Sequence, residues 1–313
     1  AFYQSGLTSV TVPNSITKIE SSTFASCAKL DNVTIGNSVT SVEEDAFDGC
    51  KDPLTITCNA AVAPTIENSN SGGFWSVTTL SLKVPAGSEE SYNNWKTTLG
   101  NMDSWWNYTA VDIKPIITIP ATGYATFCPV SNNVTLPDGL QVYTLDKMSG
   151  KNKVNIYEVL KKQGEKIVIG KGTGVLLQGT PGNTYTLDNT GYANAVPTTF
   201  TDKNAVNNLV GVTSPTQVKA DGSQYALTNY NGQAAFLQVE PGDYIPAGKA
   251  YFVPFTTPAG APSFITLYND ATAIDAVEVA DDSNDPAYNL AGQKVQRGYK
   301  GIVIKNGKTF IKR

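Results

Sequence analysis

A 23-residue repeat at the start of the chain constrains its fold more than any other feature. Leu7–Lys29 (LTSVTVPNSITKIESSTFASCAK) aligns over Leu30–Asp52 (LDNVTIGNSVTSVEEDAFDGCKD) without a gap. The matched apolar pairs are Leu7 and Leu30, Val10 and Val33, Val12 and Ile35, Ile16 and Val39, Ile19 and Val42, Phe24 and Phe47, and Cys27 and Cys50. A period of this length lies within the range of about 20–29 residues that is typical of leucine-rich repeats.

Each unit predicts one coil of a solenoid. Leu7–Val12 forms a short strand with apolar residues turned inward, and Ile16–Ile19 forms a second one after an Asn-Ser turn. Phe24 and Cys27 then fill the layer on the far side. A degraded third unit follows, with Leu54–Cys58 as its strand. Because one unit cannot bury its apolar face alone, we expect the coils to stack.

These units resemble the leucine-rich repeats of the BspA-like surface proteins of Gram-negative anaerobes, with the pattern L-x-S-V-x-[IV]-P-x-S-V-x-x-I-x-x-x-A-F-x-x-C. The first unit fits at Leu7, Ser9, Val10, Val12, Pro13, Ser15, Ile16, Ile19, Phe24 and Cys27. Leu80–Trp95 resembles the strand and helix that close such arrays, and Trp105–Tyr108 resembles their final aromatic cap. The resemblance covers about residues 1–113 and implies a non-enzymatic role in recognition or adhesion.

The middle of the chain, residues 114–270, predicts an all-β sandwich-like domain. Short apolar segments such as Tyr124–Cys128, Val175–Gln178 and Tyr251–Pro254 alternate with clusters of Gly, Pro, Asn and Asp. Regular spacing of strands and turns favours a sandwich or a barrel. The segments GYATFCPV and PAGKAYF resemble a β domain common in the same surface proteins.

The end of the chain predicts a linker over residues 271–286 and a small β tail over 287–313. Asn306-Gly307 stands between two apolar runs and indicates a two-residue hairpin turn, because both central residues must take a positive φ. The tail resembles the Y-N-L-x-G-Q segment that ends many exported proteins of such bacteria. That resemblance implies either a surface-anchoring signal or a structural cap. Overall, the predicted fold is mainly β.

Composition excludes several classes of function. The chain has no histidine, which removes every mechanism or metal site that requires an imidazole. Residues 1–113 carry 5 Lys against 12 Asp and Glu, so this part is too acidic to bind a nucleic-acid backbone. No apolar run approaches the roughly 18 residues of a transmembrane helix. We therefore predict no cofactor, no metal, no nucleic-acid partner and no transmembrane segment.

The four cysteines predict buried free thiols. Cys27, Cys50, Cys58 and Cys128 form no CxxC pair, and without histidine the zinc templates fail. A Cys50–Cys58 disulfide is the alternative in an exported protein. The opening AFYQSG is no signal peptide, so we expect a processed protein or a chain that begins inside a longer one. We expect further coils or a cap before Ala1, and an extracellular or outer-surface location.

Two motifs invite a catalytic interpretation that their spacing does not support. Glu43-Glu44-Asp45 are consecutive on a repeat turn, and so cannot hold a sugar between opposed carboxyls roughly 5–9 Å apart. Gly170–Gly174 (GKGTG) opens a predicted strand, whereas a phosphate-binding loop opens a helix.

The candidate binding residues are Thr11, Thr34 and Trp106. Thr11 and Thr34 are expected to point outward from neighbouring strands of the solenoid, beside Ser9 and Asn32. Trp106 is expected to be an exposed aromatic near the closing cap. The leading hypothesis is binding of host or extracellular proteins through the repeats. The alternatives are a glycan-binding accessory protein and a structural spacer that presents upstream repeats.

Overall fold

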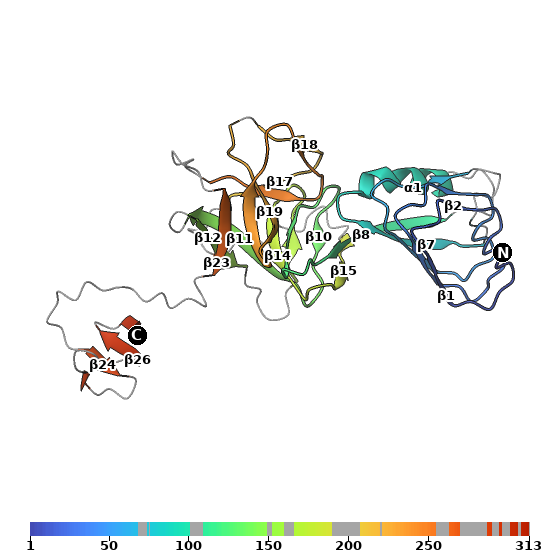
Figure 1. The fold of residues 1–313 in the computed structure, drawn as a ribbon. Helices are drawn as coiled ribbons and strands as arrows, with labels where there is room; N and C mark the ends of the chain where they lie inside the picture. Colours follow the sequence, from blue (N-terminus) through green and yellow to red (C-terminus); the bar gives the residue numbers. More distant parts are fainter. Residues whose placement is uncertain are drawn as a thin grey trace.

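The computed structural model shows a mainly β protein with one short α-helix (Figure 1). The residues that it describes are 1–67, 74, 76–100, 109–148, 152–159, 166–189, 207–219, 221–254, 263–269, 287–289, 294–295, 301–305 and 308–312. Over these ranges, no helix is long and apolar enough to cross a membrane. The mainly β class predicted from the sequence is confirmed.

A six-stranded sheet runs through the repeats in the order β1-β3-β5-β7-β8-β15. Its strands are β1 (Ser9–Val12), β3 (Asn32–Ile35), β5 (Leu54–Cys58), β7 (Thr79–Pro85), β8 (Ala110–Thr118) and β15 (Thr184–Thr186). The first five are parallel, and β15 joins antiparallel. Val10 pairs with Val33, which pairs with Ile56, so the register reproduces the sequence alignment and its degraded third unit.

A second, shorter parallel sheet lies across the repeats from the first. Its strands are β2 (Lys18–Ile19), β4 (Ser41–Val42) and β6 (Thr65–Ile66). The sequence predicted a longer strand that starts at Ile16. Ile16 instead donates its N–H to the Pro13 carbonyl at 3.1 Å and belongs to the turn, which leaves only two residues extended.

Stacked aromatic rings form the spine of the repeat core. Phe2, Phe24, Phe47 and Phe74 follow one another with 5.5 Å between successive ring centroids. Trp95 closes the row at 6.0 Å from Phe74. Offset contacts between aromatic rings add to the hydrophobic gain of burial. The stack confirms that the Phe position shared by the first two repeat units fills the interior.

The closing segment has the predicted strand-then-helix form. Strand β7 leads into the 3-10 helix η1 (Glu89–Tyr92) and the helix α1 (Asn93–Gly100). Tyr92 donates its hydroxyl hydrogen to the Ala60 carbonyl, and Trp95 donates its indole N–H to the Pro64 carbonyl, both at 2.7 Å. These two bonds let large polar-tipped rings lie fully buried. The predicted cap at Trp105–Tyr108 lies outside the described residues.

All four cysteines are free and buried, so the expected thiols are confirmed and the alternative Cys50–Cys58 disulfide is wrong. The thiol of Cys27 donates to the Phe2 carbonyl at 3.0 Å, and that of Cys50 to the Phe24 carbonyl at 3.4 Å. The same contact thus recurs one coil later. Burial raises the pKa of the Cys50 thiol to about 12, which keeps it protonated and unreactive.

The middle of the chain forms a nine-stranded sheet in the order β17-β22-β19-β20-β23-β12-β11-β14-β9. Its strands are β9 (Tyr124–Phe127), β11 (Gln141–Met148), β12 (Lys153–Glu158), β14 (Val175–Gln178), β17 (Leu209–Gly211), β19 (Tyr225–Tyr230), β20 (Gln233–Gln238), β22 (Ala250–Phe252) and β23 (Phe264–Asn269). The sheet curls around one core that takes residues from most of these strands, including Tyr143, Phe236 and Phe252.

A smaller sheet packs against part of this curled sheet. It consists of β10 (Val134–Thr135), β13 (Val168–Ile169) and β16 (Asp188–Asn189). A second core with Phe127, Val142 and Leu177 lies here. Separately, β18 (Thr216–Gln217) pairs with β21 (Tyr244–Ile245) around a small cluster of Val212, Val218 and Ile245. The Gly170–Gly174 motif forms a turn that leads into β14, as its sequence predicted.

The repeat sheet and the middle region are joined through backbone. Strand β8 pairs with β7 on one side and with β15 on the other, and so it contains the predicted boundary between residues 113 and 114. Nearby, a Cβ on Gly87 would stand 2.2 Å from the Ala247 carbonyl oxygen, and one on Gly248 would stand 2.6 Å from that of Ala86. Both glycines are therefore required for this close approach of two turns.

The tail forms its own four-stranded sheet in the order β25-β24-β26-β27. These strands are β24 (Ala287–Asn289), β25 (Lys294–Val295), β26 (Gly301–Lys305) and β27 (Lys308–Lys312). Lys305 pairs with Lys308, so β26 and β27 make the predicted hairpin across a two-residue loop. The loop residues, Asn306-Gly307, and the predicted linker over 271–286 lie outside the described residues.

Truncation of the aromatic spine is expected to destabilise the repeats severely. Phe47→Ala removes a fully buried ring between two stacked neighbours, and we expect a loss of about 3–5 kcal/mol in the free energy of unfolding. Urea unfolding followed by tryptophan fluorescence measures it. Tyr3→Ala, at a largely exposed ring, is the matched control. Equal losses in the two variants would contradict a role for the stack.

Candidate recognition surface

The outward face of the repeat sheet carries two rows of polar side chains in register. Along each strand the apolar residues point inward and are buried, except for the half-buried Val10, and the residues between them lie on the outward face. One row consists of Ser9, Asn32, Thr55, Ser81 and Asp112. The other consists of Thr11, Thr34, Thr57, Lys83 and Lys114. Each of the first three strands therefore presents two neutral polar side chains on this face.

The two predicted threonines occupy adjacent positions in one row. Thr11 is exposed and pairs directly with Thr34, which is half-buried. Thr57 continues the row, although the sequence reasoning did not single it out. Strict alternation in Leu54–Cys58 (LTITC) was the signal that could have found it. The third candidate, Trp106, lies outside the described residues.

The face changes from neutral to charged toward β8. The Lys114 ammonium lies 3.5 Å from an Asp112 carboxylate oxygen and 3.3 Å from one of Asp188, on β16. Partial burial opposes the charged form, but these two carboxylates raise the pKa of Lys114 above its usual value. The face thus carries neutral hydroxyl and amide groups near β1, and near β8 it carries a lysine paired with two carboxylates.

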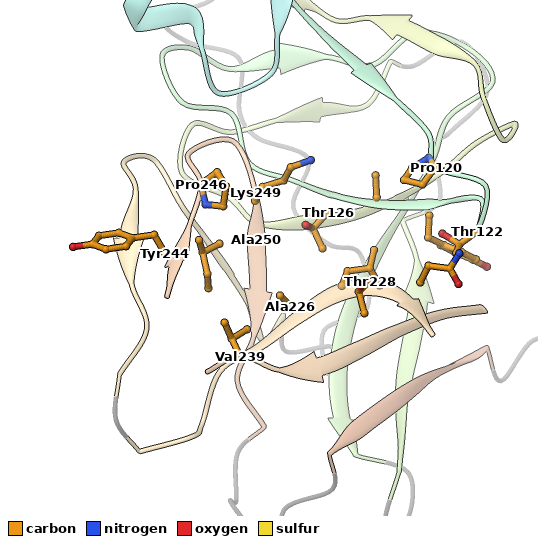
Figure 2. A pocket seen from close by; sticks show the side chains of 15 residues that line it. Pro120, Thr122, Thr126, Ala226, Thr228, Val239, Tyr244, Pro246, Lys249 and Ala250 are labelled. Atoms are coloured by element: carbon orange, nitrogen blue, oxygen red, sulfur yellow. The ribbon is translucent and has the colours of Figure 1, made fainter. Parts of the chain in front are cut away.

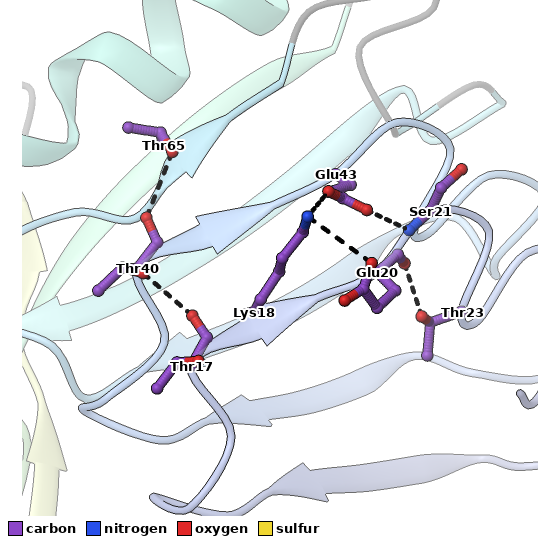
Figure 3. A network of polar contacts seen from close by, with 8 residues as sticks. All are labelled: Thr17, Lys18, Glu20, Ser21, Thr23, Thr40, Glu43 and Thr65. Atoms are coloured by element: carbon purple, nitrogen blue, oxygen red, sulfur yellow. Dashed lines mark hydrogen bonds and ion pairs between the residues drawn. The ribbon is translucent and has the colours of Figure 1, made fainter.

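The second sheet carries a different polar network (Figure 3). Thr40 donates its hydroxyl hydrogen to the Thr17 carbonyl at 3.1 Å, and Thr65 repeats this bond to Thr40 at 3.3 Å. Beside them the Lys18 ammonium pairs with Glu43, whose carboxylate also accepts the Ser21 N–H. Glu43 therefore ties two coils together.

The outward face of the repeat sheet carries groups that can form hydrogen bonds. The outward rows offer hydroxyl and amide groups that both donate and accept, on a scaffold fixed by backbone pairing. Among the described residues, no three Cys, Asp or Glu side chains gather in a way that could hold a metal ion.

The comparisons with known proteins bear on this same region. Residues 1–84 match a family model described as BspA type leucine rich repeat region, in six copies. No curated protein and no solved structure matches the chain. This match confirms, over residues 1–84, the resemblance to BspA-type leucine-rich repeats. The resemblances of the middle domain and the tail, and the association with Gram-negative anaerobes, stay predictions.

Removal of the Glu43 carboxylate is expected to reduce the loss of folding stability at acidic pH. The Lys18 ammonium, aided by the Ser21 N–H, lowers the pKa of Glu43 from its ordinary value of 4.5. A lowered pKa stabilises the fold above the ordinary value, and this contribution is lost as the pH falls through the folded-state pKa. We therefore expect Glu43→Gln to lose less stability than the wild type between about pH 5 and 3.

Chemical denaturation at a series of pH values measures this difference. Glu44→Gln, at the exposed neighbouring carboxylate, is the control and should follow the wild-type curve. If the curve of Glu43→Gln also coincided with the wild type, the ion pair would have no stabilising role.

Proposed function

We propose that this chain is a non-enzymatic recognition protein, secreted or displayed at the outer cell surface, that binds an extracellular protein through the outward face of its repeats. The observation that supports this proposal is the pair of polar rows in register across five parallel strands. The match of residues 1–84 to BspA-type repeats supports it independently, since solenoids typically present extended binding surfaces.

Thr11 and Thr34 have the central role in this proposal. Adjacent strands stand roughly 4.8 Å apart, so the row of hydroxyls forms a regular ladder. A partner with a matching repeat of donors and acceptors, such as the edge or face of another β structure, makes many modest hydrogen bonds at once. Each bond contributes only about 1 kcal/mol, so affinity comes from their number.

The remaining parts of the chain serve this surface in our proposal. The stacked coils over 1–113 form a solenoid, residues 114–270 form a sandwich-like support, 271–286 a linker and 287–313 a terminal cap or anchor. A glycan-binding role and a spacer role for upstream repeats are the two alternatives that the experiments below separate.

Arginine in the outward row is expected to block the proposed partner. Thr34→Arg and Thr57→Arg project long charged side chains from the centre of the face and leave the inward core untouched. We expect each variant to weaken binding to a responsive extracellular-matrix protein by roughly tenfold or more, because a desolvated unpaired charge costs well over 1.4 kcal/mol. Surface plasmon resonance against a panel of matrix proteins measures it.

Ser15→Arg, on an exposed turn away from the face, is the matched control and should bind as the wild type does. Equal binding by all three arginine variants would refute the outward face as the site. A glycan array with Trp106→Ala tests the first alternative, since saturable glycan binding lost in that variant would favour a lectin-like role. If the wild type bound neither the matrix proteins nor the glycans, the spacer role would be favoured.

A further inference from the structure

A pocket of about 310 Å³ opens in the wall of the nine-stranded sheet (Figure 2). Thr126 on β9 and Thr228 on β19 lie on its facing sides, and Ala250 on β22 also lines it. Pro246 and Lys249 stand at one end, whereas Pro120 and Thr122 stand at the other. Small and apolar side chains make up most of the lining, so backbone lies close to the cavity.

The edge of β9 that faces this pocket is unpaired. β9 is the terminal strand of its sheet and pairs only with β14 among the described residues. The Gly179 N–H donates to the Gly123 carbonyl, and this bond fixes which backbone groups of β9 face β14. The backbone groups of Ala125 and Phe127 bond to β14, whereas those of Tyr124 and Thr126 point away from it, toward the open edge. Cys128 follows in the same outward row.

One member of that row shows what the edge accepts. The Cys128 N–H donates to the Gly248 carbonyl at 3.0 Å, so the outward backbone N–H at the C-terminal end of this row already has a backbone partner. The pocket begins where this pairing stops, at Thr126 and Tyr124. Outward N–H and C=O groups of an edge strand form a template for another strand.

The opposite side of the pocket has a second open edge. β19 pairs with β20 along its whole length but with β22 only at Tyr225 and Ala226. The tight turn at Asn231-Gly232, with positive φ at both residues, makes Tyr230 and Gln233 the last hydrogen-bonded pair. By alternation, the backbone groups of Asn229 then point away from β20 and toward the pocket side.

Lys249 supplies the only charge in the lining. No ion pair involves it among the residues that the structure describes, although much of its side chain stays accessible. Surrounding protein atoms lower the pKa of its ammonium, because they replace part of its hydration. An unpaired, partly desolvated cation at the end of an uncharged pocket favours an anionic partner.

We infer that this pocket is a docking site for an extended peptide, which adds as a strand to the open edge of β9 and places a carboxylate against Lys249. Backbone pairing to Tyr124 and Thr126 provides affinity, and the pocket between β9 and β19 accepts the side chains that point into it. This mode of recognition needs an exposed sheet edge together with pockets for alternate residues. The carboxylate is either an acidic side chain or a free C-terminus.

Amide hydrogen exchange of the intact chain tests the edge directly. Without peptide, we expect fast exchange at Tyr124 and Thr126 and slow exchange at Ala125 and Phe127. The probe is a pool of acetylated, C-terminally amidated octapeptides that alternate apolar residues with Thr or Asp, and a second pool carries a free C-terminal carboxylate. We expect one pool to slow exchange at Tyr124 and Thr126 selectively. No protection from either pool at millimolar peptide would overturn the inference.

Peptide analogues and one variant then separate the two contacts, by fluorescence anisotropy. N-methylation at alternate peptide bonds removes backbone donors and is expected to weaken binding roughly tenfold or more. Lys249→Gln is expected to weaken it roughly fivefold to tenfold. Lys171→Gln, at an exposed lysine outside the pocket, is the matched control. Binding that survives both N-methylation and Lys249→Gln sinks the proposal, and oligosaccharide binding lost in Lys249→Gln would assign the pocket to glycans instead.

Discussion

The stacking of one coil on the next is the constraint on which the rest of the structure depends. Each repeat buries its apolar residues only because a neighbour covers them, and the phenylalanine spine shows this dependence at its simplest. Phe24 is buried between the rings of Phe2 and Phe47, and Cys27 donates to a carbonyl of the coil before it. Because side chains alternate between the two faces of a strand, fixing the inward positions also aligns the outward positions of neighbouring strands in rows.

Those outward positions were predictable because they depend on local periodicity alone. The alignment of two units placed Thr11 beside Thr34, and the register confirms this placement, while any binding role stays a proposal. The Asn306-Gly307 hairpin was predictable for a similar reason, since a two-residue turn leaves one way to pair its strands. The resemblance to BspA-type repeats indicated a family, whereas the positions of the inward and outward residues followed from the internal repeat alone.

The pocket could not be predicted, because its walls meet only through contacts between distant parts of the chain. Thr126, Ala226 and Ala250 come from separate strands, and nothing local to any of them indicates that β22 parts from β19 after Ala226. The turn at Ile16 was missed for a different reason. A hydrogen bond to the Pro13 carbonyl overrides the strand preference of a β-branched residue there.

Strand β8 has a mechanical consequence for a protein that connects two bodies. It pairs with β7 in parallel over seven residue pairs, from Thr79 and Ala110 to Pro85 and Ile116. A pull that separates the repeats from the middle region along the strand direction loads all of these backbone bonds together in shear, whereas a hairpin peels open one bond at a time. Tension is therefore carried across the junction by many bonds at once.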